Sequence, residues 1–176
     1  AYKTTRLLRD YGNWFHLMLA VDTTQTREDD RFKIYVNGVL YSGSYQVETI
    51  VAGQNYLTRA NTPGNICTIG QNTAGGANYD ANCQLTDVFM VDGQALTPDV
   101  FGFYKEGKGY QSSGTTQATD FRPGQWVPKA PRTIKTEINR RGGFGVNGFY
   151  LPMNDSSNFG ADFHCDIDSI IKLKGE

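Results

Sequence analysis

Residues 32–41 constrain the fold most, because they combine strict alternation with a turn dipeptide. Along residues 32–36, Phe, Ile and Val alternate with Lys and Tyr, which is the pattern of a strand with one buried face. The dipeptide Asn37-Gly38 follows, and both residue types tolerate the positive φ that a type I′ turn requires. Residues 39–41 then predict the partner strand. We therefore expect an antiparallel hairpin with Phe32, Ile34 and Val36 on one face and Lys33 and Tyr35 on the other.

Two further segments predict strands of a sheet that is covered on both sides. Residues 14–21 are apolar on both faces except at His16. Residues 85–91 are apolar at nearly every position except Asp87. Shorter strands are predicted within residues 46–51, 66–69 and 148–153.

Helical signals are sparse. Thr97-Pro98-Asp99 offers a capping hydroxyl, a proline for the first helical position and an acid near the positive helix end. We expect one helical turn there, which stops at Gly102. No helix of more than about two turns is predicted before residues 167–174.

Length and charge limit the class of protein. The chain has 176 residues, enough for one domain, and its 17 Lys and Arg nearly balance 18 Asp and Glu. This balance gives no electrostatic reason to expect nucleic acid or an anionic membrane as partner. No apolar run approaches the roughly 18 residues that span a bilayer. The three cysteines leave two alternatives for Cys67 and Cys83, a disulfide or two buried free thiols.

The organisation predicted is a sandwich domain over residues 1–155 and a C-terminal extension over 156–176. Residues 105–124 are polar and rich in Gly, Ser and Thr, and they predict a long loop insertion. This loop is the expected place for contacts with a partner.

The order of the motifs resembles the laminin-G or concanavalin A-like jelly-roll domain, in the version found in bacteriophage structural proteins, marine phages especially. The resemblance runs from about Leu8 to Asp155. It is carried by Trp14-Phe15-His16, Tyr35-Val36-Asn37-Gly38, Asp87 to Leu96, Phe101-Gly102, Trp126-Val127-Pro128-Lys129 and Gly145 to Leu151. It implies an all-β fold of two stacked antiparallel sheets, of the kind found in tail, fibre and head-associated proteins.

The chain departs from the family in two places. Several strands normally precede the Trp-x-His strand, so the resemblance implies a sandwich that is incomplete on its N-terminal side or completed by another segment. The insertion at 105–124 and the residues from Asn158 onward have no counterpart in the family.

The aromatic residues that flank the long loop are the candidate contacts with a ligand or partner. Exposed aromatic rings beside Asn and Gln suit a sugar- or protein-binding face, and the same rings could instead anchor the loop to the sandwich. The candidates are Tyr104, Tyr110, Phe121 and Trp126.

No metal or cofactor site is predicted. His16 is expected to be a hydrogen-bonded core histidine, because no convergent partner is evident. The adjacent His164, Cys165 and Asp166 point to opposite faces of a strand and rarely hold one ion. Calcium is a weaker alternative whose oxygen donors, without the spacing of a calcium loop, would be Asp29, Asp30, Asp92, Asn154 and Asp155.

No catalytic constellation is evident. A glycosidase needs paired carboxyl groups, and the nearest match, Asp87 and Asp92, would point to opposite faces of a regular strand. We therefore expect a non-enzymatic structural protein of a phage virion, on the head, a fibre or the tail, that docks with other virion proteins and forms a homo-oligomer. A carbohydrate-binding adhesin that recognises a host glycan is the alternative, and a glycoside hydrolase is a remote one.

Overall fold

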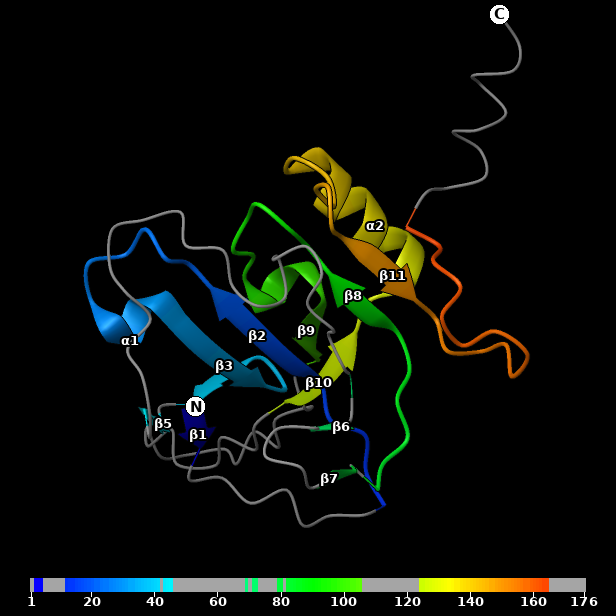
Figure 1. The fold of residues 1–176 in the computed structure, drawn as a ribbon, viewed down its shortest axis with the longest axis horizontal. Helices are drawn as coiled ribbons and strands as arrows, with labels where there is room; N and C mark the ends of the chain where they lie inside the picture. Colours follow the sequence, from blue (N-terminus) through cyan, green and yellow to red (C-terminus); the bar gives the residue numbers. More distant parts are fainter. Residues whose placement is uncertain are drawn as a thin grey trace, which may run out of the picture. The chain divides into compact units, whose positions relative to one another are not determined.

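The computed structural model describes residues 2–4, 12–41, 43–45, 69, 71–72, 79–80, 82–105 and 124–164, and strands predominate in this part of the chain (Figure 1). The helices are α1 (Glu28–Arg31), α2 (Pro131–Arg140) and the 3₁₀ helix η3 (Pro98–Val100). The strands are β1 (Tyr2–Thr4), β2 (Leu17–Val21), β3 (Phe32–Val36), β4 (Val39–Tyr41), β5 (Gly43–Tyr45), β6 (Gln71–Asn72), β7 (Tyr79–Asp80), β8 (Val88–Met90), β9 (Gly102–Lys105), β10 (Gln125–Pro128) and β11 (Phe149–Leu151).

All strand pairs among the described residues are antiparallel, which confirms a β-rich antiparallel protein. The sheets are small: β2-β3-β4 has three strands, and β1-β5, β6-β7, β8-β11 and β9-β10 have two each. The chain divides into two compact units, one of residues 1–54 and 95–134 and the other of residues 55–94 and 135–176. The expected domain boundary after residue 155 stays a prediction.

The predicted hairpin is confirmed. Strand β3 pairs with β4 in the register Val36↔Val39, and the turn residues Asn37 and Gly38 have φ of 50° and 76°. The side chain of Asn37 extends the neighbouring ladder, because its Oδ1 accepts the main-chain N–H of His16 at 2.8 Å while its own N–H donates to the His16 carbonyl. The Asn at the first turn position therefore has a second role, which ties the hairpin to the start of β2.

The expectation that residues 14–21 are buried on both faces is wrong. Strand β2 begins only at Leu17, and Trp14, Leu17 and Leu19 are 65%, 57% and 57% exposed. Among the described strands, the order β2-β3-β4 puts β2 at an edge, where a strand has one neighbour instead of two. The buried side chains of this sheet are Ile34 and Val36 of the central strand β3 and Met18 of β2, which lies on the opposite face.

The two faces of the three-stranded sheet differ in chemistry. Residues that oppose one another across a ladder share a face, and alternate residues along a strand change face. The register puts eight apolar or aromatic side chains on one side, which we call the apolar face: Leu17, Leu19, Val21, Phe32, Ile34, Val36, Val39 and Tyr41. The opposite face carries Met18, Ala20, Lys33, Tyr35 and Leu40.

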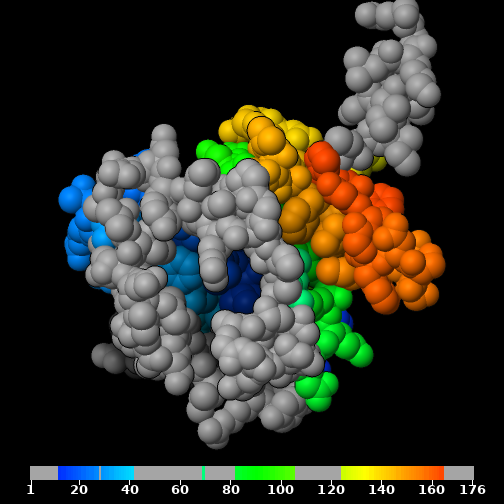
Figure 2. All heavy atoms as spheres, in the orientation of Figure 1, coloured from blue at the N-terminus to red at the C-terminus, as the bar shows by residue number. Residues whose placement is uncertain are grey.

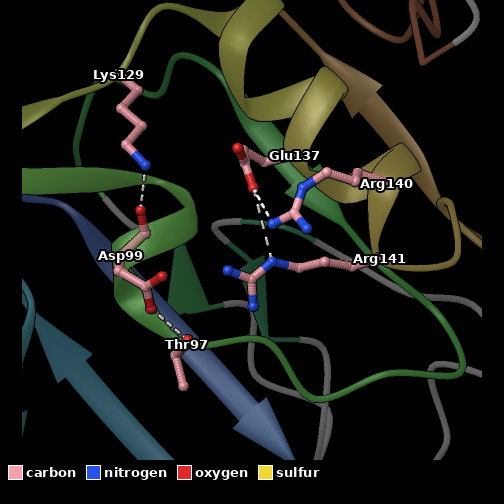
Figure 3. A network of polar contacts seen from close by, with 6 residues as sticks. All are labelled: Thr97, Asp99, Lys129, Glu137, Arg140 and Arg141. Carbon is pink, nitrogen blue, oxygen red and sulfur yellow. Dashed lines mark hydrogen bonds and ion pairs between the residues drawn. The ribbon is translucent and has the colours of Figure 1, made fainter.

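The single helical turn predicted after Thr97 is confirmed as η3, followed by Phe101 and then by β9 from Gly102. The Thr97 hydroxyl donates to the Asp99 carboxylate and makes no capping bond to the backbone. The ammonium of Lys129, which follows β10, donates to the carbonyl of Asp99 (Figure 3). This bond fixes η3 to the end of the β9-β10 ribbon.

In the second unit, β8 and β11 pair in the register Phe89↔Tyr150, and both strands are shorter than predicted. Asp87 has φ of 52°, so the regular strand begins only after it. The Asp87 carboxylate accepts the Tyr150 hydroxyl at 2.6 Å, and the Phe89 and Tyr150 rings stack with centroids 4.4 Å apart. Pro152 follows the last residue of β11, where a missing N–H costs no ladder bond.

The ten-residue helix α2 contradicts the expectation that no helix of more than about two turns occurs before residues 167–174. Its buried side chains are Ile134 and Ile138, one turn apart. At the C-terminal end of the helix, the Gly143 N–H donates to the Ile138 carbonyl at 3.0 Å. Glu137 pairs with Arg140 at 2.9 Å and with Arg141 at 3.8 Å (Figure 3). Only two apolar residues in ten concealed the helical period from sequence reasoning.

Residues 152–164 run along the surface of the second unit, as the orange and red atoms of Figure 2 show. Near the end of this segment, the Asp162 carboxylate accepts the Tyr150 N–H at 2.9 Å and the Phe163 N–H donates to the Tyr150 carbonyl at 2.8 Å. The segment 161–164 therefore covers the edge of β11 that faces away from β8. The predicted strand at 46–51, most of that at 66–69, the loop residues 106–123 and the helix at 167–174 lie outside the described residues.

Candidate binding site on the three-stranded sheet

A cavity of about 300 Å³ lies in the first unit and is open to solvent on one side. Strands β2 and β3, the turn between them and the segment before η3 contribute its walls. We call this cavity the hollow, and its lining residues are Ala20, Asp22, Gln25, Asp30, Lys33, Tyr35, Ala95, Leu96 and Thr97.

Asp22 is the carboxylate that its neighbours fix most firmly. It follows β2, and its Oδ1 accepts the Thr24 N–H at 3.0 Å and the Thr24 hydroxyl at 2.6 Å, while Oδ2 accepts the Gln25 amide at 2.7 Å. The hydrogen bonds from the Thr24 and Gln25 side chains lower the pKa of Asp22. The hollow therefore holds an ionised, oriented carboxylate at neutral pH.

The other polar groups of the hollow come from α1 and β3. Asp30 pairs with Lys33, whose ammonium lies 3.3 Å from the carboxylate Oδ1. Tyr35 stands on the same face of β3 as Lys33, and its hydroxyl makes no hydrogen bond with the described residues. The hollow thus combines a paired acid, a second acid held by neutral donors, and a phenol that is available to a ligand.

A buried arginine supports the turn that carries these groups. Arg31 is 4% exposed, and its Nη1 donates to the carbonyls of Gln25 at 3.1 Å and Thr26 at 2.8 Å. The Arg31 carbonyl in turn accepts the Asp22 N–H at 2.8 Å. Arg31 therefore holds the turn against the start of β3 from inside.

The candidate residue Trp126 is an internal anchor. Its indole ring stacks on the imidazole of His16 with centroids 5.4 Å apart, and Tyr104 meets it edge-on at 5.2 Å. The ring also lies against two glycines, since a Cβ added at Gly38 or Gly102 would come within 2.2 or 2.4 Å of it. Trp126 therefore attaches the β9-β10 ribbon to the turn of the hairpin.

Tyr104, the second candidate residue that the structure describes, is 43% exposed and donates its hydroxyl to the Asn37 carbonyl. Trp126 and Tyr104 therefore act as anchors, which was one of the two alternatives that the sequence allowed. Their contact with a ligand or partner stays a prediction. Tyr110 and Phe121 lie outside the described residues.

His16 is packed as expected but is not hydrogen-bonded as expected. Its ring contacts those of Trp126 and Phe101, and within the described residues its Nδ1 is buried without a hydrogen-bond partner. Burial lowers the pKa of this imidazole. Aromatic packing, which the sequence did not reveal, takes the place of a hydrogen bond.

The acids considered for calcium have local roles. Asp30 pairs with Lys33, Asp155 accepts the Ser157 hydroxyl at 2.6 Å, and Asp92 accepts the Asn147 amide at 2.9 Å. Asp29 and Asn154 are exposed. Among the described residues, no group of three or more His, Cys, Asp or Glu side chains could hold a metal ion.

The remaining candidates behave differently from expectation. His164 pairs through Nδ1 with Asp162 at 2.6 Å, and its neighbours Cys165 and Asp166 lie outside the described residues. Cys83 is a free, exposed thiol, which fits neither alternative for this residue, and Cys67 lies outside the described residues. Asp87 precedes β8 and Asp92 follows it in the sequence. The Asp87 carboxylate accepts a hydrogen bond from Tyr150, and the Asp92 carboxylate accepts one from Asn147.

Sequence reasoning missed the hollow. Its polar residues are spread over residues 22–35 and Thr97, and no motif joins these positions. The one available signal was the Asp-x-Thr pattern of Asp22 and Thr24, which is typical of a turn held by an aspartate side chain.

Comparison of this chain with protein-family models, with curated proteins and with solved structures finds no match. Within the part of the chain that the structure describes, no helix has the length and apolar character needed to cross a bilayer.

Proposed function

We propose that this chain is a non-enzymatic structural protein of a bacteriophage virion, in a head-decoration, fibre or tail position, which docks with other virion proteins and with copies of itself. In this proposal the three-stranded sheet is one layer of a concanavalin A-like sandwich. The ordered motifs from Trp14 to Leu151 support this assignment through their resemblance to phage structural domains.

The observation that carries the docking proposal is the apolar face. All eight of its side chains are apolar or aromatic; Ile34 and Val36 at its centre are buried within the chain, whereas Leu17, Leu19 and Val39 at its margins are about half exposed. Apolar side chains gathered on one face drive association when a second surface removes them from water. A face without charge can also meet its own copy without electrostatic repulsion, as a symmetric homo-oligomer requires.

Gold-labelled antibody against the chain, applied to particles in a lysate of the source organism, tests the location. Label over heads, fibres or tails is the expected result. Label on no particle, in a lysate where blotting detects the chain, would remove the virion assignment.

A carbohydrate-binding adhesin is the second candidate, and the hollow is the observation that favours it. Label confined to tail tips or fibre ends would support this candidate, whereas label over the whole head would favour a decoration role.

A further inference from the structure

We propose that the hollow is a binding site for a neutral, hydroxyl-rich ligand, a saccharide unit. This site goes beyond the docking role and deepens the adhesin candidate, on which it rests, and it does not depend on where in a particle the chain resides. Its volume of about 300 Å³ stands at the lower end of the range for small-molecule sites, which suits one sugar ring better than a long chain.

The hydrogen bonds and the ion pair that the two carboxylates already make leave Asp22 room for one hydroxyl of a neutral ligand. The Lys33 ammonium already neutralises Asp30, and the donors of Thr24 and Gln25 already occupy three acceptor positions of Asp22. A carboxylate offers about four such positions, so Asp22 keeps room for a single further donor. Neutral donors do not cancel the charge of Asp22, so a cationic side chain is the alternative ligand that the binding experiment separates from a sugar.

The hollow offers donors as well as acceptors. The Tyr35 hydroxyl has no partner within the described residues, and the Lys33 ammonium has further N–H groups beyond its bond to Asp30. Each sugar hydroxyl both donates and accepts, so a mixed set of this kind matches its chemistry. Ala20, Ala95 and the buried Leu96 give the lining an apolar part against which the C–H groups of a sugar ring can pack.

Ligand-observed NMR tests the proposal on the full chain, with methyl α-glucopyranoside, methyl α-galactopyranoside and methyl α-mannopyranoside as probes. Saturation transfer to at least one glycoside is expected. Tyr35→Phe removes only a hydroxyl that has no partner among the described residues, so the fold should persist while the affinity falls about tenfold, the effect of one hydrogen bond lost from a complex.

Asp22→Asn provides a second variant with a matched control. Asp155 accepts a Ser157 N–H and hydroxyl as Asp22 accepts those of Thr24, but it stands in the other unit, outside the hollow. Asp22→Asn should therefore weaken binding while Asp155→Asn leaves it unchanged.

Three results would overturn the saccharide site. The first is that none of the three glycosides shows saturation transfer, and the second is that both hollow variants leave the transfer unchanged. The third is transfer only to N-acetyl-lysine amide, which would assign the hollow to a cationic side chain. None of them bears on the particle labelling, so failure of this site and failure of the virion assignment can be told apart.

Discussion

His16 is a residue whose protonation opposes folding. Its imidazole stacks on the Trp126 ring and contacts the Phe101 ring, and burial lowers its pKa from the ordinary value of 6.5. The unfolded chain therefore binds a proton at a pH where the folded chain does not, and stability falls as the pH drops from about 6.5 towards the folded value. In a His164→Gln variant, where His16 is the remaining histidine, its ring NMR signals should titrate below pH 6.5. A midpoint at or above 6.5 would contradict this packing.

Arg31 is buried, and among the described residues its side chain donates to two main-chain carbonyls of the turn and to no carboxylate. Arg31→Ala would leave both carbonyls unpaired and should lower the free energy of unfolding by about 3 kcal/mol, the order expected for lost bonds to a charged group. The exposed Arg27, four residues earlier, provides the control, and its alanine variant should change stability by less than about 0.5 kcal/mol. If urea denaturation showed the same loss of unfolding free energy in Arg31→Ala and Arg27→Ala, the buried hydrogen bonds of Arg31 would contribute little.

The contact between elements at Gly38 is tested by a pair of glycine substitutions. Gly38 and Gly93 both have left-handed φ, 76° and 82°, but only Gly38 lies against an indole ring, that of Trp126. Gly93→Ala should cost about 1–2 kcal/mol from backbone strain, and Gly38→Ala about 1–3 kcal/mol more from the steric conflict. Similar losses of unfolding free energy in the two variants would mean that the attachment of the β9-β10 ribbon does not depend on the contact between Gly38 and the indole ring.

The edge of β11 depends on Asp162. Burial alone would raise the pKa of this carboxyl, but hydrogen bonds from the Tyr150 and His164 N–H groups and from the His164 ring outweigh it, and the pKa is lowered. Its stabilising effect is therefore present above the ordinary value of 3.8 and is lost as the pH falls through the folded value. Asp162→Ala should accelerate hydrogen exchange at the Tyr150 amide at neutral pH, while Asp155→Ala should not. Unchanged exchange in Asp162→Ala would mean that the carboxylate does not protect this edge.

Sequence patterns predicted those elements whose signals are local. The hairpin depends on alternation and on Asn37-Gly38, and η3 on Thr97-Pro98-Asp99, so both were found. Strand β2 was assigned two covered faces because its residues are apolar, but composition does not reveal that a strand lies at an edge. Helix α2 was missed because its stabilising groups are Ile134, Ile138 and a pair of ions, and too few apolar residues carry the helical period. The hollow was missed because it depends on the register of β2 and β3, which no single motif encodes.

At the scale of the whole molecule, the apolar face predicts self-association that a single charge should disrupt. Leu19 and Leu40 lie on opposite faces of the same sheet and are 57% and 53% exposed, so they form a matched pair. Native mass spectrometry and concentration-dependent light scattering of the full chain should show a homo-oligomer. Leu19→Asp should raise the concentration needed for assembly at least tenfold, because a carboxylate buried without a partner costs more than about 1.4 kcal/mol.

Leu40→Asp should leave assembly unchanged, since this side chain lies on the face that bears the hollow. Because each leucine is about half exposed, neither variant removes a fully buried side chain, and cooperative unfolding of both would exclude a folding defect. A wild-type chain that stays monomeric at every concentration would contradict the homo-oligomer, whereas equal disruption by both variants would show that the apolar face is not the contact surface. Loss of assembly in Leu19→Asp alone would connect the one-sided apolar pattern of a three-stranded sheet to the self-association of the chain.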